Sequence, residues 1–373
     1  MKTKKEKKIK SKGARVVLGI LKTLLVLVLV AVLGVAGLFG WLTVVEYNPD
    51  TVTDAETDGA GTRSVSEGDT MRIVTWNLGY GALGDNADFF MDGGKGVQTA
   101  TKERVAENLD AIGEGIEALD GDIVFVQEID RNSRRSYHID EYESFAQNWD
   151  YAAFAYNYNV KFVPIPIPPM GKVESGVAVY TDLDLGQAQR IQLPCPFSWP
   201  LRVGNLKRCL LVTRIPVQTE DGTEKELVLI NLHLEAYDSG EGKIAQTNQL
   251  RELMNSEREK GNYVIAGGDF NQTFMNVDAG MYPELEGMWH CGAIAPEDFG
   301  DGWQLVMDNT VPTCRSLDRP YAGADHDPAQ FQYYLIDGFI LSDNIEVLNL
   351  QTVDNGFVAT DHNPVVLDFK LAD

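Results

Sequence analysis

The chain has 373 residues, 44% of them apolar, and a formal net charge of −23 at pH 7. This length and apolar content allow a large folded core, near the upper end for one domain. The acidic balance disfavours diffuse attraction to polyanions, although a bound cation could still invert the field locally.

The N-terminal segment predicts a membrane anchor. Residues 1–22 carry nine basic side chains against the single acid Glu6. Leu24 to Leu42 is then a run of nineteen uncharged, mostly apolar residues. About 20 such residues are needed for a helix to cross the hydrocarbon core of a bilayer. We therefore predict a transmembrane helix over 23–43, with a basic cytoplasmic segment before it and residues 44–373 outside, because basic residues stay on the cytoplasmic side.

A cleaved signal peptide is the main rival to this anchor. Against it, the apolar run is longer than a usual signal core, and no clean small-x-small cleavage site follows Trp41-Leu42-Thr43. Residues 44–70, rich in Thr, Asp, Gly and Ser, predict a flexible linker before a domain over 71–373. The four cysteines form no C-x-x-C pair, so Cys195–Cys209 disulfide pairing and isolated thiols both stay open.

From Met71 onward the pattern predicts many strands and few helices. Apolar spacing favours a helix over Lys102–Leu119, and a second helix over Glu241–Lys260 ends at Gly261. Asp221-Gly222 predicts a hairpin turn between two strands. The further strands are expected at Gly176–Tyr180, Lys207–Val217, Glu226–Leu234, Tyr333–Leu341, Glu346–Val353 and Pro364–Leu371. This balance favours two packed sheets flanked by helices.

Four short polar signatures lie at the ends of apolar runs. They are Thr75-Trp76-Asn77, Gln127-Glu128, Gly268-Asp269-Phe270-Asn271 and Thr360-Asp361-His362-Asn363-Pro364. Strand ends at a sheet edge can aim polar side chains at one point in space. Carboxylates, amides and a histidine suit a hard divalent cation and a phosphate ester. A catalytic site is therefore the leading interpretation.

Together with Asn231-Leu232-His233-Leu234 and Ile336-Asp337, these signatures resemble the endonuclease/exonuclease/phosphatase superfamily. Its members include DNase I-like nucleases, apurinic endonucleases, neutral sphingomyelinases and inositol polyphosphate 5-phosphatases. The motifs occur in family order over about residues 71–371. The resemblance implies an α/β fold, a four-layer α/β/β/α sandwich of two mixed β-sheets, here preceded by the one N-terminal transmembrane helix.

The resemblance also implies roles for individual residues and a Mg²⁺ or Mn²⁺ cofactor. Glu128 resembles the principal metal carboxylate, with Asp361 and Asn77 beside the cation. Asp269 resembles the group that orients or deprotonates the attacking water, and His362, oriented by Asp337, a group that contacts the phosphate. The remaining assignments are His233 at the leaving oxygen and Asn271, with Asn77 and His362, in substrate binding.

Taken singly, each of these residues has an ordinary structural explanation. Asn77 and Asn271 fit turns after strands, Asp337 could satisfy backbone at a strand end, and His233 lies between two leucines like a core histidine. Only their joint occurrence favours a site. The chemistry is then metal-assisted hydrolysis of a phosphate ester.

The substrate stays open between nucleic acid and a phospholipid or sphingolipid. Basic candidates for a nucleic-acid groove are Arg131, Arg134, Arg135 and Lys207-Arg208. A phospholipid or sphingolipid phosphodiesterase would fit the membrane anchor and the apolar, proline-rich loop Pro164–Met170, although a rigid surface loop without a role is the commoner explanation of such a segment. A phosphoinositide phosphatase is less favoured, because its substrates face the cytoplasm. A monomer is expected, and a non-catalytic surface binding module on the same fold is the alternative function.

Overall fold

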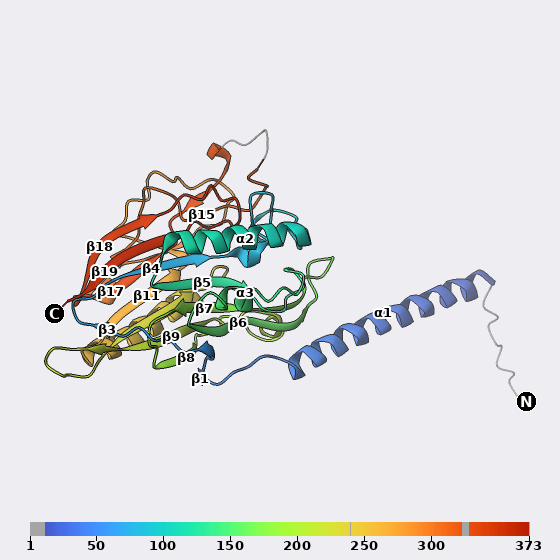
Figure 1. The fold of residues 1–373 in the computed structure, drawn as a ribbon. Helices are drawn as coiled ribbons and strands as arrows, with labels where there is room; N and C mark the ends of the chain where they lie inside the picture. The colour runs from blue at the N-terminus through green and yellow to red at the C-terminus, as the bar shows by residue number, and fades with distance from the viewer. Residues whose placement is uncertain (1–11, 239, 323–327, 373) are drawn as a thin grey trace, which may run out of the picture. The chain divides into compact units, whose positions relative to one another are not determined.

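The computed structural model describes residues 12–238, 240–322 and 328–372 (Figure 1). The chain divides into two compact units, Met1–Glu46 and Tyr47–Asp373. In the first unit, helix α1 (Lys12–Val44) is long and apolar enough to cross a membrane, judged by length and composition. The helix contains the predicted span 23–43, while residues 1–11 of the predicted basic segment lie outside the described residues.

The second unit contains two large mixed sheets. We call the eight-stranded one sheet A; its order is β1-β8-β9-β10-β11-β17-β14, with β3 paired to β9 outside this path. Its strands are β1 (Val52–Asp54), β3 (Val65–Ser66), β8 (Gln187–Gln192), β9 (Cys209–Gln218), β10 (Lys225–His233), β11 (Tyr263–Asp269), β14 (Trp303–Val306) and β17 (Asp337–Ser342).

Sheet B has seven strands in the order β18-β19-β4-β5-β7-β6-β2. Its strands are β2 (Glu56–Gly59), β4 (Thr70–Asn77), β5 (Ile123–Asp130), β6 (Tyr151–Val163), β7 (Gly171–Thr181), β18 (Ile345–Thr352) and β19 (Val365–Leu371). Smaller elements follow the main strands: β12 (Gln272–Phe274), β13 (Gly292–Ile294), α5 (Pro296–Phe299), β15 (Cys314–Arg315) and β16 (Tyr333–Tyr334).

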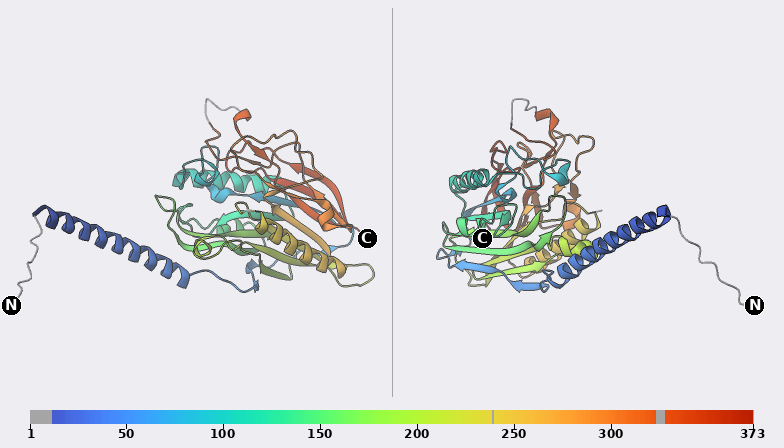
Figure 2. Two further views of the ribbon diagram at one scale, coloured as in Figure 1. Left: turned by 180° about the vertical axis from the view of Figure 1, so that it is seen from behind. Right: turned by 90° about the vertical axis from the view of Figure 1, so that its right-hand side faces the viewer.

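The helices complete four layers. Helix α2 (Lys102–Leu119) packs Val105, Ile112 and Ile116 against the outer face of sheet B, near the short helix α3 (Glu141–Ala146). Helix α4 (Glu241–Glu259) packs on the outer face of sheet A through Leu250 and Met254. Figure 2 shows α4, in gold, on the face opposite α2.

A third apolar cluster lies between the sheets, with Phe125 and Val179 from sheet B against Leu229 and Phe339 from sheet A. These side chains alternate with those that pack under the helices, because successive residues of a strand point to opposite faces. The α/β/β/α sandwich is therefore confirmed.

The predicted helices match the structure closely, and Gly261 follows α4 in the left-handed conformation, with φ 87°. The hairpin at Asp221-Gly222 joins the antiparallel pair β9 and β10. The expected strand Tyr333–Leu341 is divided into β16 and β17. All four cysteines are free thiols, so no Cys195–Cys209 disulfide is present.

The structure corrects the predicted flexible linker over 44–70. The compact unit starts at Tyr47, whose ring lies 6.0 Å from that of Tyr156. Strands β1 and β3 pair with sheet A, and β2 pairs with β6 of sheet B. The polar composition was misleading because an edge strand gains its order from backbone hydrogen bonds and needs little burial.

Candidate active site

Three adjacent strands of sheet A bring three of the predicted residues into one row. His233 ends β10, Asp269 ends β11 and Asp337 begins β17. The register pairs His233 with Asp269 across the parallel strands and Asp269 with Asp337 across the antiparallel pair. The row is therefore fixed by backbone hydrogen bonds of the sheet.

Sheet B supplies Asn77 and Glu128 from the ends of β4 and β5. A β-bulge between Gln127 and Ile129 interrupts the pairing of β5 with β7, and Glu128 has φ 51°. A bulge re-aims a side chain that regular alternation would place on the other face. Gln127 consequently bonds within the inter-sheet space, to Thr75 and Asn231, while Glu128 lines the pocket.

Asn77 connects the two sheets at the site. Its Nδ2 donates to Asp269 Oδ2 at 3.0 Å and lies 3.4 Å from Glu128 Oε1. Its Oδ1 accepts the backbone N–H of Gly79 at 3.0 Å and retains a second lone pair. One amide therefore orients two carboxylates that come from different sheets.

Asp269 is held at both carboxylate oxygens. The backbone N–H of Asn271 donates to Oδ1 at 2.9 Å, an Asx-type turn that leaves Asn271 at φ 52°. On the other oxygen, Oδ2, His233 Nε2 lies 3.5 Å away and His362 Nε2 lies 3.8 Å away. The Asn271 side chain donates one amide N–H to the carbonyl of Leu234.

His362 and Asp361 come from the loop before β19. His362 Nδ1 lies 2.9 Å from Asp337 Oδ2, and its carbonyl accepts the indole N–H of Trp76. Asp337 is positioned in turn by the hydroxyl of Thr313, which accepts the Asp337 backbone N–H at 3.2 Å. The imidazole is therefore oriented with Nε2 toward Asp269.

The two histidines have opposite protonation preferences. Burial lowers the pKa of His233 well below its ordinary value, and the nearby Arg208 guanidinium adds to the effect. Burial also disfavours charge on His362, but contacts with Cys314 and Asp337 raise its pKa well above the ordinary value. These opposite shifts favour a neutral His233 and a protonated His362, the kind of separation that assigns different roles to similar groups.

Three carboxylic acids of the site, Asp269, Glu128 and Asp361, have raised pKa values. Burial, reinforced by Asp337, raises the pKa of Asp269 to about 7. Burial also raises the pKa of Glu128 and of Asp361, and the charge of Asp361 adds to the effect on Glu128. Two such carboxylates facing one space favour a bound cation, which relieves their repulsion.

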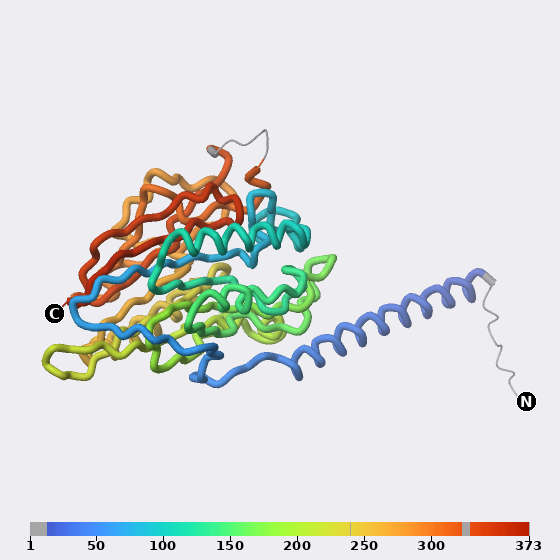
Figure 3. Tube along the Cα trace, viewed as in Figure 1, coloured from blue at the N-terminus to red at the C-terminus, as the bar shows by residue number. Residues whose placement is uncertain are grey.

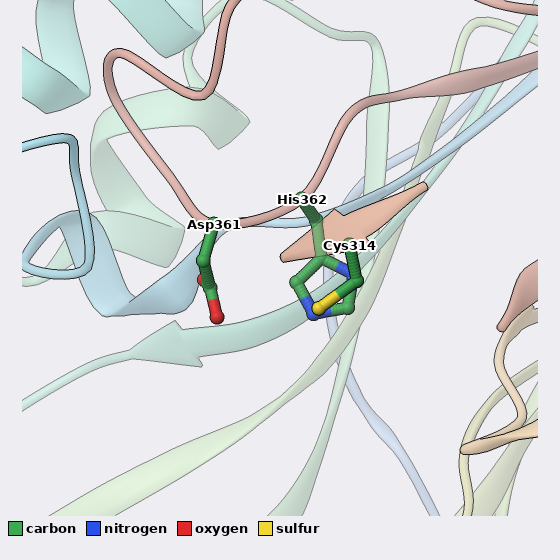
Figure 4. Close-up of side chains that lie close together, drawn as sticks. All are labelled: Cys314, Asp361 and His362. Carbon is green, nitrogen blue, oxygen red and sulfur yellow. The ribbon is translucent and has the colours of Figure 1, made fainter. Parts of the chain in front are cut away.

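Two groups of possible metal ligands share His362. Cys314, Asp361 and His362 each place a donor atom within 4.8 Å of the others, as do Asp269, Asp337 and His362. Figure 4 shows the Cys314 sulfur beside the His362 ring and the Asp361 carboxylate apart from it. The oxygen donors of Glu128, Asp361 and Asn77 suit a hard cation better than a set with a thiol.

The site lies in a pocket of about 420 Å³. Glu128, His233, Asp269, Asn271, Asp361 and His362 line it, whereas Asn77 and Asp337 are outside this lining and contact residues that belong to it. Of the predicted basic candidates only Arg135 and Arg208 line the pocket, and each pairs with a carboxylate, Asp130 or Glu235. Arg135 also stacks on the Tyr80 ring, 3.5 Å from its centroid.

The rest of the pocket wall is largely apolar, and most of it was not predicted. Apart from Val163, the last residue of β6, it comes from the segments between the main strands and helices: Leu83, Phe89, Phe90, Met91, Ile165, Met170, Phe197, Leu206, Met288, Trp289 and Leu317. Only the loop containing Ile165 carried a sequence signal. The others lack periodicity, so the sequence gives no reason to group them.

Comparison with known proteins identifies the family. The model of the endonuclease/exonuclease/phosphatase family matches residues 74–362, whereas a comparison with curated proteins gives no match. The chain is similar to the endonuclease/exonuclease/phosphatase from Beutenbergia cavernae DSM 12333, with 20% identity, TM-score 0.54, and coverage of 81% of this chain and 72% of that one.

Two further structures show weaker likeness. The endonuclease/exonuclease/phosphatase from Bacteroides vulgatus has 15% identity, TM-score 0.49 and coverage of 81% and 99% of the two chains. The human Nocturnin catalytic domain has 15% identity, TM-score 0.47 and coverage of 85% and 98%. The match to the family model extends from the first signature strand to the histidine of the last, and the chain therefore belongs to the endonuclease/exonuclease/phosphatase family.

Proposed function

We propose that this protein is a divalent-metal-dependent phosphodiesterase that acts outside the membrane, most favourably on a phospholipid or sphingolipid. The observation that carries the proposal is the convergence in one pocket of acidic oxygen donors with the Asp337–His362 pair and Asp269. Family membership supports a phosphate ester as the substrate class.

The residues present fit a hard cation. Glu128, Asp361 and the free lone pair of Asn77 Oδ1 would hold Mg²⁺ or Mn²⁺, since these ions prefer oxygen ligands. Burial disfavours the charge on both carboxylates, and a cation would offset that cost. When bound, the ion supplies positive charge that neutralises the phosphate and the leaving oxygen.

Asp269 is the proposed general base. Its carboxylate is fixed by Asn77 and Asn271, and a pKa of about 7 suits proton transfer near neutral pH. The oxygen of a water forms a new bond to phosphorus, the opposite ester P–O bond breaks, and the water proton passes to Asp269. The leaving oxygen takes up a proton from solvent, and Asp269 then returns the water proton to solvent.

The two histidines and Asn271 have separate proposed roles at the phosphate and at the leaving oxygen. A protonated His362, held by Asp337, stabilises negative charge on the phosphate oxygens. The neutral His233 hydrogen-bonds the leaving oxygen, in keeping with its lowered pKa. Asn271 retains one amide N–H for a phosphate oxygen, because Leu234 uses the other.

The pocket favours a lipid over a nucleic acid. A nucleic-acid groove needs basic side chains along its length, but Arg135 and Arg208 are each engaged by a carboxylate. The wall instead presents side chains such as Phe89, Met91 and Phe197. Apolar walls with a few convergent polar groups suit a ligand with an apolar body.

The proposed location follows from the lysine-rich leader before α1. Basic residues remain cytoplasmic, so the catalytic unit would lie on the opposite side. Protease added outside intact cells should digest the catalytic unit and spare an N-terminal tag. Protection of the catalytic unit would reverse the proposed orientation.

The function is tested with the full chain in phospholipid nanodiscs. The substrates are sphingomyelin, phosphatidylcholine, single-stranded DNA and bis-p-nitrophenyl phosphate, each with Mg²⁺, Mn²⁺ or EDTA. We expect cation-dependent diester hydrolysis that EDTA abolishes. Glu128→Gln should lower the rate by at least about 100-fold and weaken Mg²⁺ binding measured by calorimetry, whereas the exposed Glu107→Gln should change neither. Silence on every substrate without cation binding would favour a non-catalytic binding module.

A further inference from the structure

Two loops at the pocket expose large apolar side chains to solvent. Ile165 and Ile167 are 64% and 93% exposed in the loop between β6 and β7. Trp199 and Leu201 are 59% and 65% exposed in the segment between β8 and β9. We call these four residues the apolar rim. In Figure 3 the β6–β7 loop, in light green, projects from one end of the catalytic unit.

The apolar rim is continuous with the pocket. Ile165 belongs both to the rim and to the pocket wall, and Phe197 lines the pocket from the second loop. The two loops are connected through β6, because the Tyr158 hydroxyl donates to the carbonyl of Gly204 at 3.0 Å. An apolar surface therefore leads from solvent to the ionisable groups.

The first loop is built to stay exposed. Four of the residues at 164–169 are prolines, and each fixes its backbone φ near −65°. Arg134 Nη1 donates to the carbonyl of Pro169 at 2.8 Å and holds the loop end. A loop fixed in this way cannot easily fold its isoleucines back onto the domain.

The segment that connects α1 to the second compact unit is short. Residues 45–51 join Val44 of α1 to Val52 of β1. An extended chain spans at most about 3.5 Å per residue, so this connection reaches no more than about 28 Å. With α1 in a bilayer, the catalytic unit is thus restricted to the immediate neighbourhood of the lipid surface.

We propose that the apolar rim inserts into the outer surface of the bilayer that holds α1, so that the pocket receives a phospholipid directly from that bilayer. Isolated exposed apolar residues are ordinary, but grouped ones at the edge of a functional pocket mark an interaction surface. Trp199 has the amphipathic ring that prefers the membrane interface. That the pocket takes a phospholipid as substrate rests on the proposed phosphodiesterase activity. That the protein docks on the bilayer rests on the apolar rim alone.

Docking is measured independently of catalysis. The full chain is placed in phosphatidylcholine nanodiscs with or without brominated acyl chains, and tryptophan fluorescence is recorded for the wild type and for Trp199→Phe. The difference between the two proteins isolates Trp199. We expect brominated lipid to quench this difference signal at least about twofold, because insertion places the indole near the acyl chains. An unquenched Trp199 signal would overturn docking.

Catalysis is then measured on two substrates with the double variant Ile167→Ser/Leu201→Ser. Hydrolysis of bilayer sphingomyelin or phosphatidylcholine should fall at least about tenfold, because membrane docking scales with buried apolar area. Turnover of soluble bis-p-nitrophenyl phosphate should stay within about twofold, because neither side chain lines the pocket. The matched control Met275→Ser/Leu348→Ser changes exposed apolar residues outside the rim and should leave both rates unchanged.

The outcomes separate docking from the proposed function. An equal fall on both substrates, or no fall on the bilayer substrate, overturns the inference. Hydrolysis by the wild type of single-stranded DNA but of neither lipid also overturns it. Quenching of Trp199 with no hydrolysis of any substrate instead refutes the phosphodiesterase proposal and leaves membrane docking standing.

Discussion

The floor of the pocket and its apolar rim are built in opposite ways. The floor consists of Glu128, His233, Asp269, Asp361 and His362, which are all buried except the half-buried Glu128. Second groups hold them, as Asp337 holds His362 and Asn77 holds Asp269. At the rim, Ile167 and Leu201 are exposed and lie in loops. The floor is fixed by the register of neighbouring strands, whereas the rim depends on loop sequence. Reaction chemistry and access of substrate can therefore change independently in this fold.

The largest effect should come from removing a reacting group of the floor. Asp269→Asn or His362→Ala should lower kcat/KM on bis-p-nitrophenyl phosphate by at least about 1,000-fold, because each loses a proton-transfer or charge-stabilising group. Melting temperature and circular dichroism should show that the fold persists.

Two exposed residues provide matched controls. Asp110→Asn on α2 and His290→Ala should retain wild-type rates, since both side chains are outside the pocket. Near-normal turnover by either floor variant, with metal present, would refute the proposed mechanism.

A smaller loss of activity is expected for Asp337, which contacts His362 but does not line the pocket. Asp337→Asn should reduce kcat by about 10- to 100-fold, as for other carboxylates that orient a histidine. The carboxylate helps to raise the pKa of His362, so its loss should lower that pKa. Because the protonated imidazole is the proposed active form, the alkaline limb of the pH–rate profile should move to lower pH. A fall in rate with an unmoved limb would indicate a purely structural role.

The smallest effect on activity is expected far from the pocket, at the buried ion pair of Glu257 and Arg214. Glu257→Gln should leave kcat/KM unchanged but lower the free energy of unfolding by about 1–3 kcal/mol, because the Arg214 guanidinium loses the more buried of its two charged acceptors and keeps only Glu226. Chemical denaturation of both proteins at several pH values measures this difference.

The pH dependence of that difference has a defined sign. Burial raises the pKa of Glu257, but hydrogen bonds from Arg214 and Lys260 outweigh it and lower this pKa to about 2. The pKa of the same group in an unfolded chain is about 4.3. The stabilisation is complete above the unfolded pKa and is lost as pH falls through about 2. The two proteins should therefore differ most at pH 6–7 and converge in strong acid. A difference that grows in acid would contradict this account.

The sequence placed the residues of the floor at or beside strand ends, and the structure brings them together in one pocket, while their roles stay predictions. A buried strand can be recognised from its apolar run. The end of that run then locates polar residues such as Asp269, the last residue of β11. The bulge that turns Glu128 into the pocket could not be predicted from the sequence, because a bulge depends on pairing with a strand that is distant in the chain. Thr313, which positions Asp337, lacked a signal for the same reason.

The apolar wall was largely beyond sequence analysis. Phe89, Phe197 and Trp289 lie far apart in the chain and meet only through the closure of several loops. For the segment 44–70 the sequence predicted too little structure: a flexible linker was expected before residue 71, but the second compact unit begins at Tyr47. All four residues of Glu56–Gly59 are exposed and none has an apolar side chain, yet the segment is ordered by pairing with β6.

That pairing has a practical consequence for anyone who shortens the chain. The family match begins at residue 74, which suggests a recombinant protein starting near Met71. Such a truncation would remove β1 and β2, the strands that cover β8 and β6. Uncovered strand edges recruit other chains through their free backbone groups. A soluble version that begins at Tyr47 should stay monodisperse, whereas one that begins at Met71 should aggregate.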